Sequence, residues 1–415
     1  MLNKPLSSFM GKALSSNQMH VGHKVLVVSE RWWPDGSGGI LASHLIAGLL
    51  RDAGFKLTIV HGTREPLRLN GVRYVYSSLL SVRDKHRLWL NCLILARKHW
   101  FRKLISRSDV VYIPRYCYPL IPVAKRFGKR VVVHLHDYQP VSYNSIVFSE
   151  QAKGRVNVVS FEVLEHGSIA RALFAGFTSP VNGLCRVWLR DADAVICVSM
   201  GQAELISELA SELTEKLKVV YNPLPNIPLV EKNLGDLTFL YLGGDSYVKG
   251  FHIFLRASQE VLKRDLNVKF LLAGGFKDVN RLIIEKLNRS FKRAYNLLGY
   301  LKHEGVSKLY SISHALLFPS ICEEPLPYAV LEAMLTGTIP IASEVGGVPE
   351  IVGGTLAERF MFKPRDVDGL IDRMEAVLAM SSSDVMNVGL KLREAVLRRF
   401  SIEDTKKRLL EVFST

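Results

Sequence analysis

The sequence lacks long apolar runs and paired cysteines. No run of about eighteen apolar residues, the length that a membrane-spanning helix needs, occurs in the chain, so we predict no transmembrane helix. The five cysteines form no C-x-x-C pair, and they stand at Cys92, Cys117, Cys185, Cys197 and Cys322. Such scattered cysteines are typical of reduced thiols in a cytoplasm, and they argue against a disulfide framework or a zinc site.

Acidic side chains are missing from residues 1–20, which are polar and rich in serine. The segment also lacks the arginines and the amphipathic pattern of a transit peptide. A weak transit-like segment and a frayed tail both stay open as interpretations, and we favour a flexible N-terminal tail.

The composition indicates two globular domains with an uneven charge. Apolar residues make up 48% of the 415 residues, which is enough for each domain to bury its own core. The formal net charge is +15, of which residues 1–222 carry +13 and residues 223–415 carry +2. The first half is therefore expected to face something anionic, such as nucleic acid, a lipid surface or a charged acceptor.

Apolar strands and helices alternate through the first half. The predicted strands are Lys24–Ser29, Leu57–Val60, Val72–Tyr76, Val110–Ile113 and Arg130–Leu135. This alternation predicts a parallel, doubly wound α/β sheet. A glycine loop, Glu30–Gly39, joins the first strand to a helix over Ile40–Ala53. Because the loop lacks the third spaced glycine of a dinucleotide fingerprint, NAD binding is not expected.

Two histidines and an aspartate stand where the last of these strands ends. They are His134, His136 and Asp137, in the sequence VVVHLHDYQP. Side chains at the carboxyl ends of parallel strands project into the ligand crevice, although a histidine bonded within the sheet is the alternative. A zinc site would need a third ligand, which nothing nearby supplies. The D-x-D string Asp191–Asp193 runs straight into a buried strand, so we interpret it as a strand start rather than a metal site.

Residues 83–107 combine aromatic and basic side chains in one predicted helix. The segment contains Trp89, Trp100 and Phe101 together with Arg97, Lys98, Arg102, Lys103 and Arg107. A basic, tryptophan-bearing amphipathic helix can lie on an anionic bilayer surface. A domain helix with a solvated basic face explains the pattern equally well, so membrane contact is a hypothesis.

The stretch Phe318–Val352 places a helix start beside two acids. A buried strand, Ala315–Phe318, ends at a loop, and a helix over Tyr328–Leu335 follows. A helix N-terminus directs free backbone N–H groups at one place and attracts anions, phosphate above all. Glu324 before the helix and Glu332 on it can accept hydrogen bonds from the hydroxyl groups of a sugar and a ribose on either side of that phosphate.

This framed Glu-x7-Glu pattern, PSICEEPLPYAVLEAMLTGTIPIASEVGGVPE, resembles the retaining glycosyltransferases of family 4. The resemblance implies the α/β GT-B fold, with two Rossmann-like doubly wound domains that face a central cleft. It implies an acceptor-binding domain at 21–222 and a nucleotide-sugar-binding domain at 223–399. A last helix, at 400–415, would pack back toward the first domain.

The resemblance also implies roles for single residues. Glu324 would hold the hydroxyls of the donor sugar and Glu332 the ribose, while Lys249 would meet the charge of the leaving diphosphate. His136, matched by its position, would contact the donor sugar, and Asp137 is a weaker match to the acceptor site. The other implied donor-binding residues are Gly38, Gly39, Gly243, Gly244, Gly274, Leu301, Pro325, Leu326 and Pro327.

The implied reaction moves a sugar from a nucleotide-diphosphate sugar to a hydroxyl acceptor on a glycan, a lipid or another molecule. It proceeds with retention of configuration and needs neither a metal nor another cofactor. In this family the leaving phosphate takes the acceptor proton, so we expect no protein nucleophile. We further expect a cytoplasmic protein with no nucleic acid partner, which contacts the membrane, if at all, through residues 83–107.

The sequence departs from the family pattern at Gly244, where the family usually has an arginine. The substitution weakens the expected phosphate clamp. Two other classes stay open. One, suggested by Gly244, is a non-catalytic partner that binds nucleotide sugars. The other is a GT-B nucleotide-sugar epimerase or other GT-B enzyme, although such enzymes lack the Glu-x7-Glu pair within its longer motif.

Overall fold

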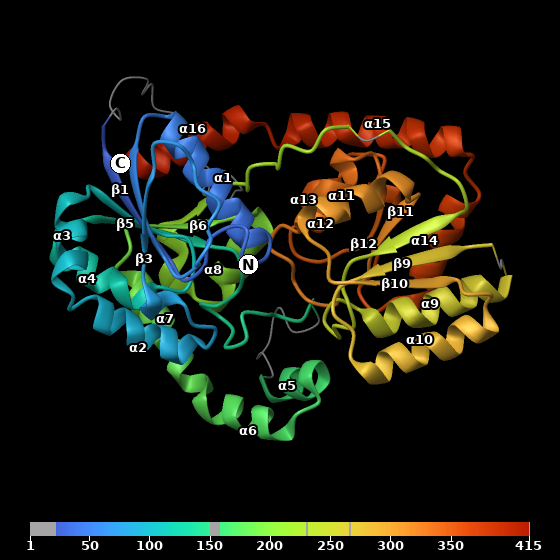
Figure 1. The fold of residues 1–415 in the computed structure, drawn as a ribbon, viewed down its shortest axis with the longest axis horizontal. Helices are drawn as coiled ribbons and strands as arrows, with labels where there is room; N and C mark the ends of the chain where they lie inside the picture. Colours follow the sequence, from blue (N-terminus) through green and yellow to red (C-terminus); the bar gives the residue numbers. More distant parts are fainter. Residues whose placement is uncertain (1–21, 150–157, 230, 265–266, 415) are drawn as a thin grey trace. The chain divides into compact units, whose positions relative to one another are not determined.

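The computed structural model describes residues 22–149, 158–229, 231–264 and 267–414, and the expected tail over 1–20 lies outside them. The chain divides into two compact units, coloured along the sequence in Figure 1. Unit 1 contains the described residues up to 146 together with 177–223 and 400–414. Unit 2 contains the described residues of 147–176 and 224–399.

Unit 1 is an α/β unit with a parallel sheet. Its strands are β1 (Lys24–Ser29), β2 (Lys56–His61), β3 (Arg73–Tyr76), β4 (Val110–Ile113), β5 (Arg130–Leu135), β6 (Ala194–Cys197) and β7 (Leu217–Val219). Its helices are α1 (Gly38–Asp52), α2 (Lys85–Leu95), α3 (His99–Arg107), α4 (Ile121–Arg126), α7 (Gly183–Arg190), α8 (Met200–Leu209) and α16 (Ile402–Ser414). Short 3-10 helices lie at η2 (Ser78–Leu80), η3 (Tyr118–Leu120), η5 (Ser179–Asn182) and η6 (Ser211–Lys216).

Unit 2 repeats this architecture. Its strands are β8 (Thr238–Tyr241), β9 (Lys269–Ala273), β10 (Tyr295–Gly299), β11 (Ala315–Phe318), β12 (Ile339–Ser343) and β13 (Met361–Phe362). Its helices are α5 (Val158–His166), α9 (Phe251–Arg264), α10 (Asp278–Ser290), α11 (His303–Ile312), α12 (Tyr328–Leu335), α13 (Val348–Val352), α14 (Val367–Leu378) and α15 (Ser382–Arg399), with η7 (Glu358–Phe360). Helix α6 (Ile169–Thr178) begins in unit 2 and ends in unit 1.

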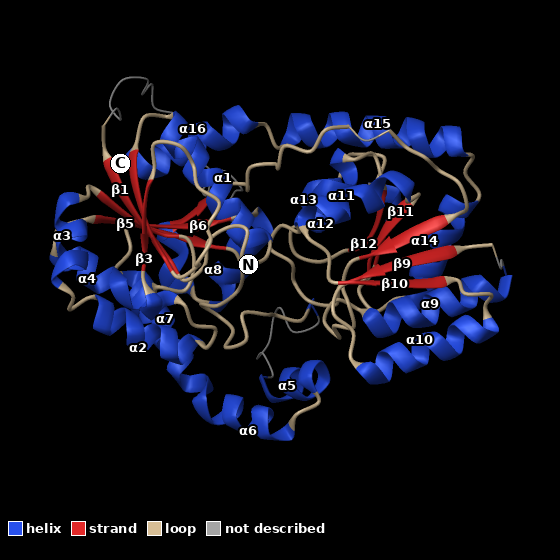
Figure 2. Cartoon of the chain, in the orientation of Figure 1, coloured by secondary structure: helices blue, strands red, loops and turns tan. Residues whose placement is uncertain are grey.

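Each sheet reverses its strand order once. The order is β3-β2-β1-β4-β5-β6-β7 in unit 1 and β10-β9-β8-β11-β12-β13 in unit 2, with helices around both sheets in Figure 2. The described strands pair in parallel throughout, as β1 does with β4 and β8 with β11. The reversal points lie between β1 and β4 and between β8 and β11. In doubly wound sheets, ligands bind at the carboxyl ends of the strands beside such a reversal.

The central strands form where the sequence is continuously apolar. Strand β1 buries every residue after Lys24, and β4 and β11 are almost wholly buried. Parallel strands covered by helices on both faces need this pattern, because neither face meets water. Helix α12 follows Pro327 and ends before Gly337, whose φ of +72° suits glycine.

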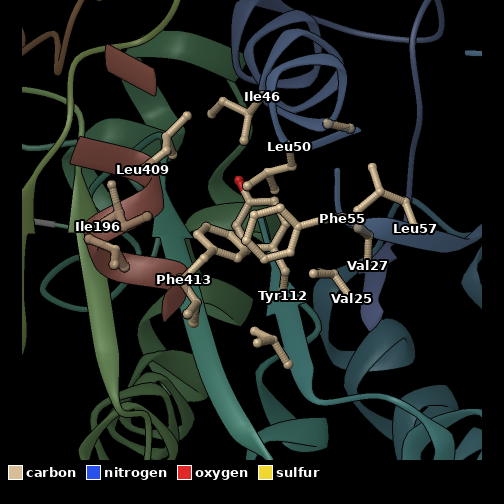
Figure 3. Packing of buried hydrophobic residues seen from close by; sticks show 14 of the residues in the cluster. Val25, Val27, Ile46, Leu50, Phe55, Leu57, Tyr112, Ile196, Leu409 and Phe413 are labelled. Carbon is tan, nitrogen blue, oxygen red and sulfur yellow. The ribbon is translucent and has the colours of Figure 1, made fainter. Parts of the chain in front are cut away.

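The last helix, α16, belongs to the core of unit 1. Figure 3 shows Leu409 and Phe413 packed among Ile46, Leu50 and Tyr112. The ring of Phe413 meets the ring of Tyr112 edge to face at 5.1 Å. The Arg130 side chain also donates a hydrogen bond to the Val412 carbonyl at 2.9 Å. The end of the chain therefore helps to hold the first sheet together.

Two expectations need correction. Residues 83–107 form two helices, α2 and α3, and Trp89 and Phe101 are buried, so these rings do not form an exposed stripe. The predicted first domain also included residues 147–149 and 158–176, which the structure describes as part of unit 2. There the Glu323 N–H donates to the Val147 carbonyl at 2.7 Å, and Phe148 bridges to Cys322. These backbone contacts join residues that are far apart in the sequence, so local sequence patterns do not reveal them.

We predict that Phe413→Ala lowers the free energy of unfolding by about 3–5 kcal/mol, because it removes a buried ring and leaves a cavity. Urea unfolding measures this loss. The matched control is Leu397→Ala, at a leucine that is 45% exposed on α15 and should change stability by less than about 0.5 kcal/mol. Equal effects of the two substitutions would contradict the placement of α16 in the core.

Candidate active site

An ion pair bridges the two strands at the reversal point of unit 2. Lys249 lies in the loop after β8, and Glu324 lies in the loop after β11. The Lys249 Nζ is 2.5 Å from the Glu324 Oε1, and the Ser320 hydroxyl donates to the same oxygen at 2.9 Å. The Glu324 side chain is 12% exposed and that of Lys249 is 40% exposed. The pair is thus oriented by the protein and still open to a ligand on the lysine side.

A glycine turn fixes the backbone of Glu324. The Gly347 N–H donates to the Glu324 carbonyl at 2.8 Å, and the Glu323 carboxylate accepts from the Gly346 N–H at 2.5 Å. A Cβ at Gly346, whose φ is +50°, would lie 2.1 Å from the Glu324 carbonyl oxygen. Only glycine permits this approach. The Gly-Gly turn therefore fixes the backbone position of Glu324, from which its side chain extends.

Burial and neighbouring charges shift the pKa values of Lys249 and Glu323. Desolvation is the largest single influence and opposes the charge of Lys249. The Glu324 carboxylate, together with Cys322 and Glu165, nevertheless raises the pKa of Lys249 above its usual value. The lysine is therefore a lasting positive charge at neutral pH. Burial raises the pKa of Glu323. The hydrogen bond from the Gly346 N–H acts against this rise, and the neighbouring Glu324 adds to it.

A cavity of about 260 Å³ lies beside Lys249. Its walls come from the ends of β8 and β11 and from the first turn of α12, through Gly243, Ser246, Pro319 and Ala329. It lies where the topology of unit 2 predicts a ligand. The N-terminus of α12 adds backbone N–H groups, since the first turn of a helix has no intrahelical acceptors for them.

The predicted residues around α12 have distinct surroundings. Pro327 is the N-cap residue of the helix, preceded by Pro325, and Leu326 is buried. Glu332, one turn into the helix, is 6% exposed and lies 2.8 Å from the Nε2 of His303. Leu301 lies in the short loop between β10 and this histidine. The structure thus brings the 299–303 loop and Glu332 together.

The two glycine turns after β8 and β9 pack backbone against backbone. A Cβ on Gly244, whose φ is +58°, would lie 2.6 Å from the Gly275 carbonyl oxygen, and a Cβ on Gly274 would lie 2.6 Å from the Gly244 nitrogen. A Cβ on Gly243 would lie 2.3 Å from the Tyr241 hydroxyl oxygen. An arginine at position 244 would need a different backbone path. The close packing of the two turns therefore requires glycine at position 244, where the family pattern has arginine.

A second ion pair stands at the reversal point of unit 1. Glu30 follows β1, Arg115 follows β4, and the Arg115 Nε is 2.5 Å from the Glu30 Oε1. The Glu30 side chain is 5% exposed. Its other oxygen, Oε2, is buried and has no hydrogen-bond partner among the described residues. A carboxylate oxygen in this position can accept a hydrogen bond from a hydroxyl group.

His136 lies against the glycine loop of unit 1. A Cβ at Gly39, the second residue of α1, would lie 2.8 Å from the His136 Cβ. The His136 Nε2 is 3.4 Å from the Ser43 hydroxyl, and its Nδ1 is buried without a partner among the described residues. Burial, with His134 and Arg115 nearby, lowers the pKa of His136 well below 6.5, so the ring is neutral at pH 7.

Asp137 and His134, on either side of His136 in the sequence, make contacts within unit 1. Asp137 accepts hydrogen bonds from the Tyr116 hydroxyl and from the Gln139 N–H, so its carboxylate is engaged within unit 1. The His134 ring stacks on the His136 ring at 4.3 Å, and its Nδ1 lies 2.9 Å from the Tyr112 hydroxyl. Gly38 begins α1, after the N-cap residue Ser37. The histidine bonded within the sheet is thus His134, whereas His136 faces the glycine loop.

Sequence reasoning missed Glu30, Arg115, Ser320 and His303. Glu30 and Arg115 follow strand ends by one and two residues, so the rule that selected His136 could have selected them too. Ser320 stands inside the recognised motif, next to the strand end. No sequence signal marks His303, because its contact with Glu332 depends on the packing of α11 beside α12.

The described residues hold no group of three or more histidine, cysteine, aspartate or glutamate side chains that could bind a metal. Asp193 of the D-x-D string accepts hydrogen bonds from the Val131 N–H at 2.7 Å and from Lys125 at 2.7 Å. It therefore joins β5 to the start of β6, as a strand-start residue would. No helix in the described part of the chain is long and apolar enough to cross a membrane.

Several known proteins are similar to this chain. Residues 227–391 match the family model of the glycosyl transferases group 1. The matched segment lies within unit 2. A human phosphatidylinositol N-acetylglucosaminyltransferase subunit is 23% identical over 80% of this chain and 64% of its own length. Glycogen synthase of Mycobacterium tuberculosis is 25% identical over 60% of each protein.

A third relative is an uncharacterized glycosyltransferase, MJ1607, of Methanocaldococcus jannaschii. It is 27% identical over 45% of this chain and 50% of its own length. The alignments with these three relatives thus span between half and two thirds of the relatives' lengths.

Solved structures identify the fold as GT-B. Sucrose-phosphate synthase from Thermosynechococcus elongatus superimposes with a TM-score of 0.70 and 18% identity, over 94% of this chain and 98% of its own. HepE from Anabaena, in complex with UDP and glucose, gives a TM-score of 0.67 and 16% identity, over 95% of this chain and 100% of its own. The expectation of two Rossmann-like α/β domains of the GT-B type is confirmed.

We predict that Gly244→Ala lowers the free energy of unfolding by about 1–3 kcal/mol, since alanine adds left-handed backbone strain and a clash with Gly275. The adjacent Gly275→Ala is the matched control, because its Cβ would meet no atom within 4 Å. Urea unfolding of both variants measures the difference. A Gly244→Ala variant as stable as Gly275→Ala would contradict the packing of the two turns.

We also predict that buried His134 makes stability depend on pH. Burial lowers the pKa of His134 to about 3, against about 6.5 when unfolded, so between these values the unfolded chain binds one more proton. Stability is therefore lost as the pH falls below about 6.5, by about 2 kcal/mol from this residue at pH 5. Urea unfolding from pH 7 to pH 5 should show a shallower decline in His134→Asn, whereas identical declines would contradict the assignment.

Proposed function

We propose that the protein is a retaining, metal-independent glycosyltransferase. It transfers a sugar from a nucleotide-diphosphate sugar to a hydroxyl acceptor. The observation that carries this proposal is the Lys249–Glu324 pair, held at the reversal point of unit 2 beside a cavity of about 260 Å³. An acid that accepts from sugar hydroxyls and a cation for the diphosphate are the two groups that this chemistry requires.

The donor belongs to unit 2 in this proposal. The Lys249 ammonium and the N-terminal N–H groups of α12 supply positive charge for the diphosphate, which is the role a metal plays elsewhere. Glu332 accepts hydrogen bonds from the ribose, with His303 keeping its carboxylate in place. We propose a UDP-sugar as donor, supported by the structural likeness to HepE, which was solved with UDP and with UDP-glucose.

The reaction proceeds without a protein nucleophile. The bond between the anomeric carbon and the diphosphate oxygen breaks, and the acceptor oxygen bonds to that carbon on the same face. The acceptor proton passes to the leaving phosphate oxygen. Glu324 holds the sugar while this occurs, and Lys249 stabilises the negative charge that develops on the diphosphate.

The acceptor belongs to unit 1 in this proposal. The buried Oε2 of Glu30 can accept a hydrogen bond from a hydroxyl group. The Nδ1 of the neutral His136 ring, also buried, can donate to a hydroxyl or accept from it, according to the tautomer. We propose a lipid-linked hydroxyl acceptor at a cytoplasmic membrane face, supported by the positive charge of the first half. The similarity to the human phosphatidylinositol N-acetylglucosaminyltransferase points the same way.

Gly244 favours a second candidate, a protein that binds nucleotide sugars without transferring them. The packing of Gly244 against Gly275 leaves no room for the phosphate-clamping arginine of the family pattern. Donor binding without release of UDP, with or without acceptor, would identify this second candidate.

We predict that Glu324→Ala lowers turnover by a factor of about one hundred or more, because it removes a group that holds the sugar in the transition state. Release of UDP from UDP-sugars measures turnover. Glu344→Ala, which removes a half-exposed acid paired with Lys363, is the control and should leave turnover unchanged. Near wild-type turnover in Glu324→Ala would exclude Glu324 from the site.

A further inference from the structure

A cavity of about 490 Å³ lies in unit 1, between helix α3 and the strands β1, β2 and β3. It is at the amino ends of these strands, since Lys24 begins β1, Lys56 begins β2 and Arg73 begins β3. Glu30 and Arg115 follow the carboxyl ends of β1 and β4. Because the six residues of β1 extend over about 20 Å, the cavity is separate from the residues assigned to the acceptor.

The cavity is lined by five basic side chains and, among the described residues, by no acidic one. The five are Lys24, Lys56, Arg73, Lys103 and Arg107. All of them are exposed, and none forms an ion pair with a carboxylate in the described part of the chain. The acid closest in sequence to the last of them, Asp109, is outside the lining and accepts a hydrogen bond from the Lys24 backbone N–H at 2.8 Å. The cavity therefore carries an unbalanced positive charge.

The sheet places three of these charges on one face. Lys24 and Lys56 are neighbours in the register of β1 and β2, and Thr58 and Arg73 are neighbours in that of β2 and β3. Side chains two residues apart on a strand share a face, so Lys56 and Thr58 lie on the same side of β2. The three basic side chains consequently lie close together. Like charges on neighbouring strands repel each other, and an anion bound among them would remove this cost.

Helix α3 supplies the opposite wall. Trp100, Lys103, Leu104 and Arg107 line the cavity, and their spacing of three and four residues places them on one side of the helix. Trp100 is 39% exposed. Its ring therefore offers a flat apolar surface beside the lysine and the arginine, against which the carbon part of a ligand can pack.

Phosphate groups suit these walls. An arginine guanidinium binds phosphate oxygens through a fork of N–H donors, and a lysine ammonium binds them as a point charge. A phosphate monoester carries a charge of about −1.5 to −2 at neutral pH, so about two or three such groups balance five cations. Sites for small molecules usually have volumes of about 300–1,000 Å³, a range that includes this cavity.

We propose that this cavity, which we call the basic cavity, binds a ligand that carries two or more phosphate groups. A soluble organic polyphosphate and the polyphosphorylated headgroup of a lipid have this chemistry in common. The proposal goes beyond the proposed function, because no residue of the basic cavity is assigned to the donor or to the acceptor. It also gives a location to part of the positive charge of the first half of the chain.

The test is calorimetric titration of the whole protein with tripolyphosphate. We expect binding that weakens as the salt concentration rises. In Lys103→Ala/Arg107→Ala, binding should be about tenfold weaker or worse, since two charge-assisted contacts with phosphate are lost. The matched control is Lys391→Ala/Arg398→Ala, which removes the same two charges from exposed positions on α15 and should bind as the wild type does. No binding by the wild type, or equal weakening in both double variants, would overturn the proposal.

Trp100 reports where the ligand binds. We expect tripolyphosphate to change the tryptophan fluorescence of the wild type, and Trp100→Phe to lose this change while it retains calorimetric binding. Lys249→Ala should keep the change, because Lys249 belongs to the candidate donor site in unit 2. A fluorescence change that Lys249→Ala removes and Lys103→Ala/Arg107→Ala keeps would assign the anion to the donor site and overturn the proposal.

Two further arms distinguish the sources of the ligand. Sedimentation of the wild type with vesicles that contain about 5% phosphatidylinositol bisphosphate, lost in Lys103→Ala/Arg107→Ala, would support the proposal with a lipid headgroup as the ligand. Tripolyphosphate binding without such sedimentation would support it with a soluble ligand. Single-stranded RNA that binds more tightly than tripolyphosphate and displaces it from the basic cavity would overturn the proposal in favour of a nucleic acid.

Discussion

Two ion pairs, one in each sheet, occupy the positions on which the candidate site depends. Lys249 and Glu324 join the ends of β8 and β11, and Arg115 and Glu30 join the ends of β1 and β4. Each pair lies where strand order reverses, so the helices that follow leave on opposite sides and leave room for a ligand. A charged side chain that is partly buried needs an opposite charge or hydrogen bonds to offset the loss of its hydration. A diphosphate and sugar hydroxyls would offer partners of the same kinds.

Close approaches at glycines place the backbone beside two residues of the candidate sites. Gly346 lets the turn approach the Glu324 carbonyl, and Gly39 lets α1 approach His136. The same device explains Gly244, whose contact with Gly275 excludes a side chain. In the proposed reaction, Lys249 and the N-terminus of α12 therefore supply the positive charge of unit 2. A charge and backbone N–H groups that are already in position need no rearrangement when negative charge develops in a reaction.

Much of the fold could be predicted because the central strands are buried on both faces. β1, β4, β5 and β11 have the bounds that their continuous apolar runs predict. Edge strand β10 was missed, since most of its residues are only partly buried and it carries no such run. The division of 83–107 and the place of 147–149 and 158–176 depend on tertiary contacts. In the site, the family motif led to Glu324 and Glu332, whereas His303 becomes visible only once α11 and α12 are packed.

The central claim is that a nucleotide sugar binds in unit 2 beside the Lys249–Glu324 ion pair. A crystal structure of the protein soaked with UDP-glucose tests it most directly. We expect the sugar hydroxyls on the Glu324 carboxylate, the diphosphate on Lys249 and the start of α12, and the ribose on Glu332. Nucleotide density elsewhere on the protein, with the cavity beside Lys249 filled only by water, would contradict the account.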